Sequence, residues 1–145
     1  MRIVIFTLSI TFLLSQDHWE TAIFASDEWK FIVPVVEPSS SWREVDYNDS
    51  DWVNSQGGFG YGDGDDGTII EPTISVYLRK GFNVVDLTKL SCAILSADYD
   101  DGYVAYLNGI EISRSDNLSG AGTFVPFNEI TSYDHEASLC QGGTP

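Results

Sequence analysis

Alternating polarity is the feature that most constrains the fold of this chain. From residue 17 onward, apolar residues alternate with polar ones, and Gly, Asn, Asp and Ser interrupt them at short intervals. Because successive side chains of a strand point to opposite faces, this alternation favours strands with one face in a core and the other in water. We therefore expect an all-β fold with the short, closely spaced strands of a sandwich or barrel. The expected strands are residues 21–25, 29–33, 75–84, 92–97, 103–107 and 110–113.

The strongest local signal is a hairpin centred on Asn108-Gly109. The apolar segment 104–107 precedes this dipeptide and the alternating segment 110–113 follows it. Asn and Gly both accept the positive φ angles of a two-residue type I′ turn, so we expect the two segments to pair as antiparallel strands.

Two other stretches, 37–67 and 116–145, are rich in turn residues and predict long loops. The first also contains aromatic residues, which is typical of a loop packed over a sandwich. These residues are Trp42, Tyr47, Trp52, Phe59 and Tyr61.

The N-terminus predicts export. Met1-Arg2 and the apolar run 3–14 resemble the basic and hydrophobic regions of a signal peptide, and the run is too short to span a bilayer. We expect a signal peptide over 1–16 and one domain over 17–145, in a protein that is secreted or displayed at the cell surface. Cleavage after Ala25 and a buried first strand are the alternatives.

Export would allow a disulfide between Cys92 and Cys140, the two cysteines of the chain. Cys92 lies in an apolar run, where a buried, inert thiol is the more common outcome, so we expect that in preference to the disulfide.

The chain is strongly acidic, with 22 Asp and Glu against seven Lys and Arg and a formal net charge of −15. Nucleic acids and anionic membrane surfaces bind clustered positive charge, so neither is an expected partner. The charge is compatible with a solvated surface, with divalent cations, or with a neutral ligand such as a sugar.

Several phrases together resemble the galactose-binding-like β-sandwich modules of large secreted bacterial proteins. Those proteins often also carry a kinase-like domain of the spore-coat CotH type, lamin-tail domains or a sorting domain. The phrases are WKF (29–31), DSDW (49–52), GGFGYGDGDD (57–66), VYLRKGFNV (76–84), ADYDDGYVAYLNG (97–109), DHEA (134–137) and QGG (141–143).

The resemblance implies an antiparallel, jelly-roll-like sandwich that packs beside neighbouring domains. Modules of this kind usually continue past the QGG phrase into one or two further strands, so the resemblance also implies that the last strands are missing here. Their absence would leave an open sheet edge, which favours strand addition from a partner.

Two acidic clusters are candidate calcium sites, because Ca²⁺ takes six to eight oxygen ligands and closely spaced carboxylates can surround it. One is Asp63, Asp65 and Asp66 in a Gly-rich stretch. The favoured one is Asp98, Asp100 and Asp101, which also resembles the aspartate pair of the sugar-binding PA14 adhesin modules. The alternative is that these residues only build turns.

Carbohydrate binding is the expected function, in an accessory module without catalysis. Trp42 and Trp52 are candidate platforms for sugar rings, although core packing is their alternative role, and Asn108 is a candidate partner for sugar hydroxyls. A structural spacer without a ligand is the second hypothesis. A hydrolase using His135 between Asp134 and Glu136 is a remote third, since the chain holds no nucleophile-elbow motif.

Overall fold

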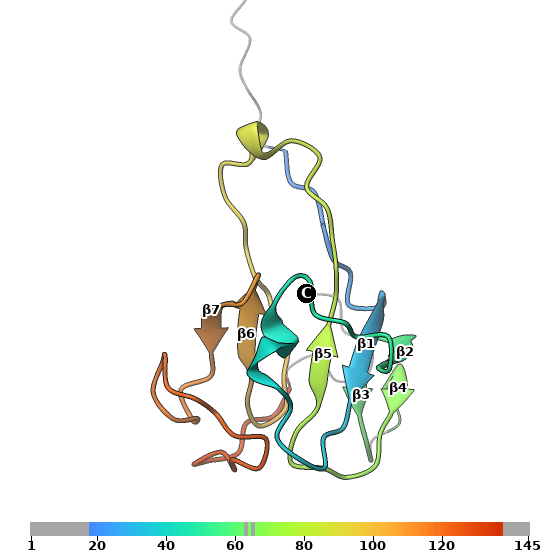
Figure 1. Cartoon of the computed structure of the whole chain (residues 1–145), viewed down its shortest axis with the longest axis vertical. Helices are drawn as coiled ribbons and strands as arrows, with labels where there is room; N and C mark the ends of the chain where they lie inside the picture. Colours follow the sequence, from blue (N-terminus) through green and yellow to red (C-terminus); the bar gives the residue numbers. More distant parts are fainter. Residues whose placement is uncertain (1–17, 63, 65, 138–145) are drawn as a thin grey trace, which may run out of the picture.

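The computed structural model describes residues 18–62, 64 and 66–137 (Figure 1). Its regular elements are seven β-strands and two short 3₁₀ turns, and the described residues form no α-helix. The all-β expectation is therefore confirmed. The part of the chain that is described also contains no helix with the length and apolarity needed to cross a membrane.

The largest sheet has three antiparallel strands in the order β2 (Val53–Gln56), β1 (Glu28–Ile32) and β5 (Tyr77–Arg79). Strand β1 lies within one residue of its predicted position. Phe31 pairs with Val53 on one side and Leu78 on the other, so the central strand carries apolar partners across both ladders.

A second, two-stranded sheet pairs β3 (Phe59–Gly60) with β4 (Thr68–Ile69) in parallel, which departs from the expected antiparallel pattern. The Thr68 hydroxyl donates to the Gln56 carbonyl and to Ser55 Oγ, which ties this pair to β2. Because β2 and β3 lie between residues 37 and 67, the prediction of an unbroken long loop there was wrong.

The predicted hairpin is confirmed as β6 (Val104–Leu107) and β7 (Ile110–Arg114). Asn108 and Gly109 adopt φ angles of 50° and 82°, as a type I′ turn requires. A bulge follows the turn, since Tyr106 pairs with Glu111 whereas Ala105 pairs with Ser113. Ile112 is the extra residue, and its side chain is 51% exposed.

Three predicted strands are corrected. Residues 21–25 and 92–97 form no strand, and of 75–84 only β5 is a strand. The apolar residues of these segments have no neighbouring strand to pair with in the described structure. Strand propensity depends on such neighbours, so alternation alone was not sufficient.

Aromatic side chains form the most closely packed part of the molecule. Trp52 is only 8% exposed. Its ring stacks on Trp42, which follows Ser41 in the 3₁₀ turn η1 (Ser40–Arg43), and it meets the edge of Tyr47. Trp42 also makes edge contacts with Tyr77 of β5 and Tyr106 of β6, so one ring joins the sheet to the hairpin. We call Trp42, Trp52, Tyr47, Tyr77 and Tyr106 the aromatic layer.

Residues 81–97 leave β5, extend well beyond the strands and return to β6 (Figure 1). We call this segment the projecting arm, and it is tipped by the 3₁₀ turn η2 (Leu87–Lys89). The large apolar side chains along it are all at least 40% exposed. They are Phe82, Val84, Val85, Leu87, Leu90, Ile94 and Leu95.

Candidate functional site

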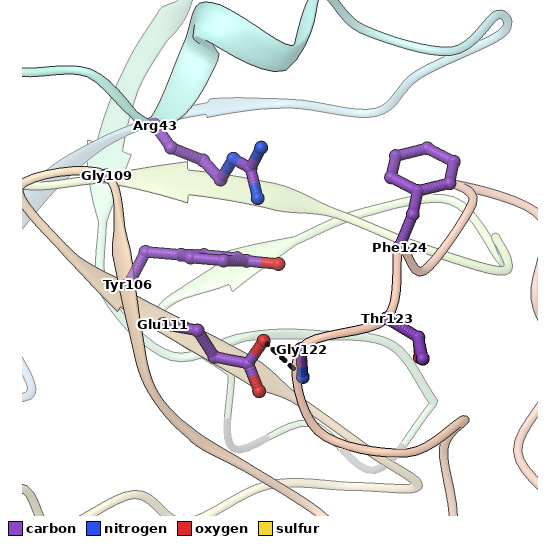
Figure 2. A pocket seen from close by; sticks show the side chains of 7 residues that line it. All are labelled: Arg43, Tyr106, Gly109, Glu111, Gly122, Thr123 and Phe124. Carbon is purple, nitrogen blue, oxygen red and sulfur yellow. Dashed lines mark hydrogen bonds between the residues drawn. The ribbon is translucent and has the colours of Figure 1, made fainter.

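An open pocket of about 290 Å³ lies where three segments distant in sequence meet (Figure 2). Arg43 comes from the end of η1, Tyr106 and Glu111 come from facing positions of the hairpin, and Phe124 belongs to the loop that follows β7. The remaining lining residues are Gly109, Gly122 and Thr123.

Tyr106 forms the floor on which Arg43 lies. The Arg43 Cζ atom is 4.8 Å from the centre of the Tyr106 ring, a cation–π contact. The Tyr106 ring also makes an edge contact with Trp42, and the two ring centres are 5.6 Å apart. The aromatic layer therefore fixes the position of one wall of the pocket.

Arg114 fixes the opposite wall. Its Nε and Nη2 atoms donate to the two oxygens of Glu111, each at 2.7 Å, in a bidentate pair. Its Nη1 atom donates to the carbonyls of Ser119 and Gly120, and Nη2 also donates to the Thr123 carbonyl at 2.9 Å. One side chain thus shapes the loop that carries Phe124.

The hydrogen bonds from Arg114 hold the pKa of the Glu111 carboxyl below its usual value, although partial desolvation opposes the shift. Glu111 therefore enters the pocket as a carboxylate whose charge Arg114 already balances. Its Oε2 atom also accepts a long hydrogen bond of 3.4 Å from the Gly122 N–H (Figure 2).

Phe124 is the exposed apolar element of the pocket, with 62% of its surface accessible. It faces the Arg43 and Tyr106 wall from the far side of the opening (Figure 2). The pocket thus combines one free aromatic ring with a guanidinium and a carboxylate held in fixed positions.

The two tryptophans predicted as sugar platforms lie in the aromatic layer. Trp52 is buried, and Trp42 is half-buried with three aromatic contacts, so neither ring presents a free face of the kind Phe124 has. Core packing, the alternative given for both, describes their placement. Asn108 is exposed and serves the hairpin turn with its positive φ angle.

The predicted calcium ligands Asp98, Asp100 and Asp101 occupy the turn before β6. Asp101 adopts a φ angle of 62°, its N–H donates to the His135 carbonyl, and its own carbonyl accepts from the buried side chain of Asn117. Across the described residues, no three His, Cys, Asp or Glu side chains come together as a metal site requires. The contacts of Asp101 are those of a turn residue, and the calcium site stays a prediction. Asp63 and Asp65 of the second cluster lie outside the described residues.

His135 packs against the same turn. Its ring stacks on Tyr99 with centres 4.2 Å apart, and its Nδ1 atom donates to the Tyr99 carbonyl, so both of these contacts of the side chain are structural. Cys92 is exposed on the projecting arm, so the prediction of a buried thiol was wrong. Cys140 and the signal peptide over 1–16 lie outside the described residues.

Sequence reasoning missed Arg43, Glu111 and Phe124. The Asn108-Gly109 turn sets a register that places Tyr106 opposite Glu111, so this pair could have been found. Nothing in the sequence indicates that η1 and the loop after β7 meet at the hairpin.

A comparison with known proteins found no protein-family model, no curated protein and no solved structure that matches the chain.

Proposed function

We propose that this protein is a non-catalytic accessory module that binds carbohydrate in the pocket between Arg43 and Phe124. Sugar rings present flat apolar faces and a rim of hydroxyls, and they bind to an aromatic ring flanked by fixed hydrogen-bonding groups. Phe124 supplies the exposed ring, and Arg43, Glu111 and Thr123 supply donors and acceptors around it. This combination is the observation that carries the proposal.

The volume of the pocket supports a small ligand. About 290 Å³ is at the lower end of the range of about 300–1,000 Å³ that small-molecule sites occupy. The pocket is open to solvent, as suits one or two units of a longer chain that continues into water.

The wider setting rests on the sequence. The basic and apolar N-terminus supports export, and the resemblance to galactose-binding-like modules supports a place beside other domains of a secreted or cell-surface protein. Antiparallel pairing in β2-β1-β5 and in the hairpin is compatible with a jelly-roll-like sandwich. The proposal gives Ca²⁺ no role, because the aspartates before β6 do not converge.

Replacement of the exposed ring tests the proposal. Phe124→Ala removes the stacking face without opening a core, so we expect binding on a glycan array to fall about tenfold or more while thermal unfolding stays unchanged. Phe24→Ala is the matched control, because Phe24 is similarly exposed at 59% and does not line the pocket. Equal glycan binding by the wild type and Phe124→Ala would refute this use of the pocket.

A spacer or interaction domain without a ligand is the second candidate. The exposed apolar side chains of the projecting arm favour it, since contiguous apolar surface of this kind often marks a protein contact. A folded protein that binds no glycan on the array, with an arm that is protected from hydrogen exchange when neighbouring domains are present, would favour this function over carbohydrate binding.

A further inference from the structure

Arg43 differs from the other cationic side chains of the described residues. Each of the others has a carboxylate oxygen within 4 Å: Lys30, Arg79, Lys80, Lys89 and Arg114. In a chain with 22 acidic residues, such pairing is expected for every cation. Arg43 forms no ion pair within the described part of the chain, although it lies in a pocket that Glu111 also lines.

The geometry explains why Arg43 forms no ion pair among the described residues, although its charge acts on Glu111 from a distance. Glu111 turns both of its oxygens to Arg114, which satisfies that carboxylate in a bidentate pair. The Glu44 carboxylate lies against Gly109 at the hairpin tip, so close that a Cβ atom added to this glycine would be 2.8 Å from Oε2. Glu44 forms no ion pair with Arg43. Two carboxylates, those of Glu44 and Glu111, therefore lie near the pocket, and neither forms an ion pair with Arg43.

The guanidinium is also held ready for a ligand. Its Nε atom donates to the Ser40 carbonyl at 3.3 Å, and its Cζ atom lies over the Tyr106 ring. Both Nη atoms have no protein acceptor among the described residues, and the guanidinium end is directed across the pocket opening (Figure 2). A guanidinium with two parallel N–H groups free matches the planar fork of a carboxylate.

We propose that the pocket selects a sugar acid, with the carboxylate of a uronic acid unit paired to Arg43 and the sugar ring against Phe124. This inference rests on the proposed function and makes it specific. A single carboxylate on an otherwise neutral ring suits one available cation, whereas a densely charged polyanion would be repelled by the net charge of −15.

The test compares sugar acids with their neutral forms on the full chain. Oligosaccharides that carry a single galacturonate or glucuronate unit on an otherwise neutral chain, the carboxyl methyl esters of these compounds, and the matching galactose and glucose oligosaccharides are titrated by calorimetry. We expect at least one acid to bind about tenfold to a hundredfold tighter than its ester and its neutral counterpart. The ester comparison uses the wild-type protein, so it does not depend on a variant that folds.

Arg43→Gln should abolish the preference for the acid, and it should weaken binding of the acid far more than binding of the neutral sugar. Arg43→Lys, which keeps the charge but loses the fork, should retain only part of the preference. Lys89→Gln is the control, because it removes one exposed positive charge, 84% accessible, away from the pocket.

The outcomes separate the two proposals. Equal affinity for acid, ester and neutral sugar would overturn the assignment of Arg43 and leave carbohydrate binding intact. Exclusive binding of sulfated sugars would also overturn it, since a tetrahedral sulfate lacks the planar carboxylate. A folded wild-type protein that binds none of the sugars would overturn the proposed function together with this inference.

Discussion

The aromatic layer and the projecting arm are both rich in apolar residues, yet their side chains differ in solvent exposure. In the layer, rings from η1, β5 and β6 contact one another, and Trp52 retains 8% of its surface. Along the arm, Ile94 is 72% exposed and Val85 is fully exposed. An apolar side chain is stabilised only where other groups cover it, and the large apolar side chains of the arm stay at least 40% exposed.

The two regions also differ in their polar contacts. Asp49 joins strands near the layer, because its carboxylate accepts from Arg79 Nε at 2.8 Å and lies 3.1 Å from Lys30 Nζ. The hydrogen bonds of the arm join its own residues, as where Asp86 caps η2 through the Thr88 N–H and hydroxyl. Of these two regions, the packed one is therefore the one that long-range polar contacts reinforce.

The largest expected effect is the loss of the buried ring. Trp52→Ala should lower the free energy of unfolding by about 3–5 kcal/mol, because it leaves a cavity between Trp42 and Tyr47. Urea unfolding followed by circular dichroism measures this change. Trp19→Ala, at a position 64% exposed, should change little. Similar losses in the two variants would contradict the contrast between packed and exposed regions.

An intermediate effect is expected from Asp49→Asn. Burial, the largest single influence, would raise the pKa of Asp49, but hydrogen bonds and charges from Arg79 and Lys30 together lower it. Loss of these charge-assisted bonds should cost about 1–3 kcal/mol near neutral pH.

The lowered pKa of Asp49 also sets a pH dependence. The carboxylate stabilises the fold at pH values above its unfolded pKa of about 3.9, and this contribution is lost as the pH falls through the lower, folded pKa. The difference in unfolding free energy between the wild type and Asp49→Asn should therefore stay constant from about pH 7 to about pH 5 and shrink as the pH falls below about 4. Asp51→Asn, at an exposed neighbouring position, is the control, and a pH-independent difference would exclude this ion pair as the cause.

The smallest effect is expected on the arm. Leu87→Ala, at a side chain 70% exposed, should change the free energy of unfolding by less than about 0.5 kcal/mol. Leu78→Ala in β5 makes the same chemical change at a half-buried position and should cost about 1–3 kcal/mol. An equal cost at both positions, measured by thermal unfolding, would show that the arm is packed in solution.

The residues that sequence reasoning placed well carry local signals. Asn108 and Gly109 accept the positive φ angles of a type I′ turn, and this local preference favours a hairpin whatever the tertiary contacts of the two strands. The same reasoning failed for 92–97, because an apolar segment becomes a strand only beside a partner. Sequence reasoning also proposed Trp42 and Trp52 as ligand platforms. The sequence around an aromatic residue in a turn-rich stretch is the same whether its ring faces water or packs on a second ring.

The sequence by itself determined the all-β class, the hairpin and the position of β1, because alternation and turn chemistry act between near neighbours. Only the tertiary structure decided that Arg43, Glu111 and Phe124 share a pocket and that Arg43, among the cationic side chains of the described residues, forms no ion pair. Those facts depend on contacts between η1, the hairpin and the loop after β7, and residues so far apart in the chain leave no periodic signal.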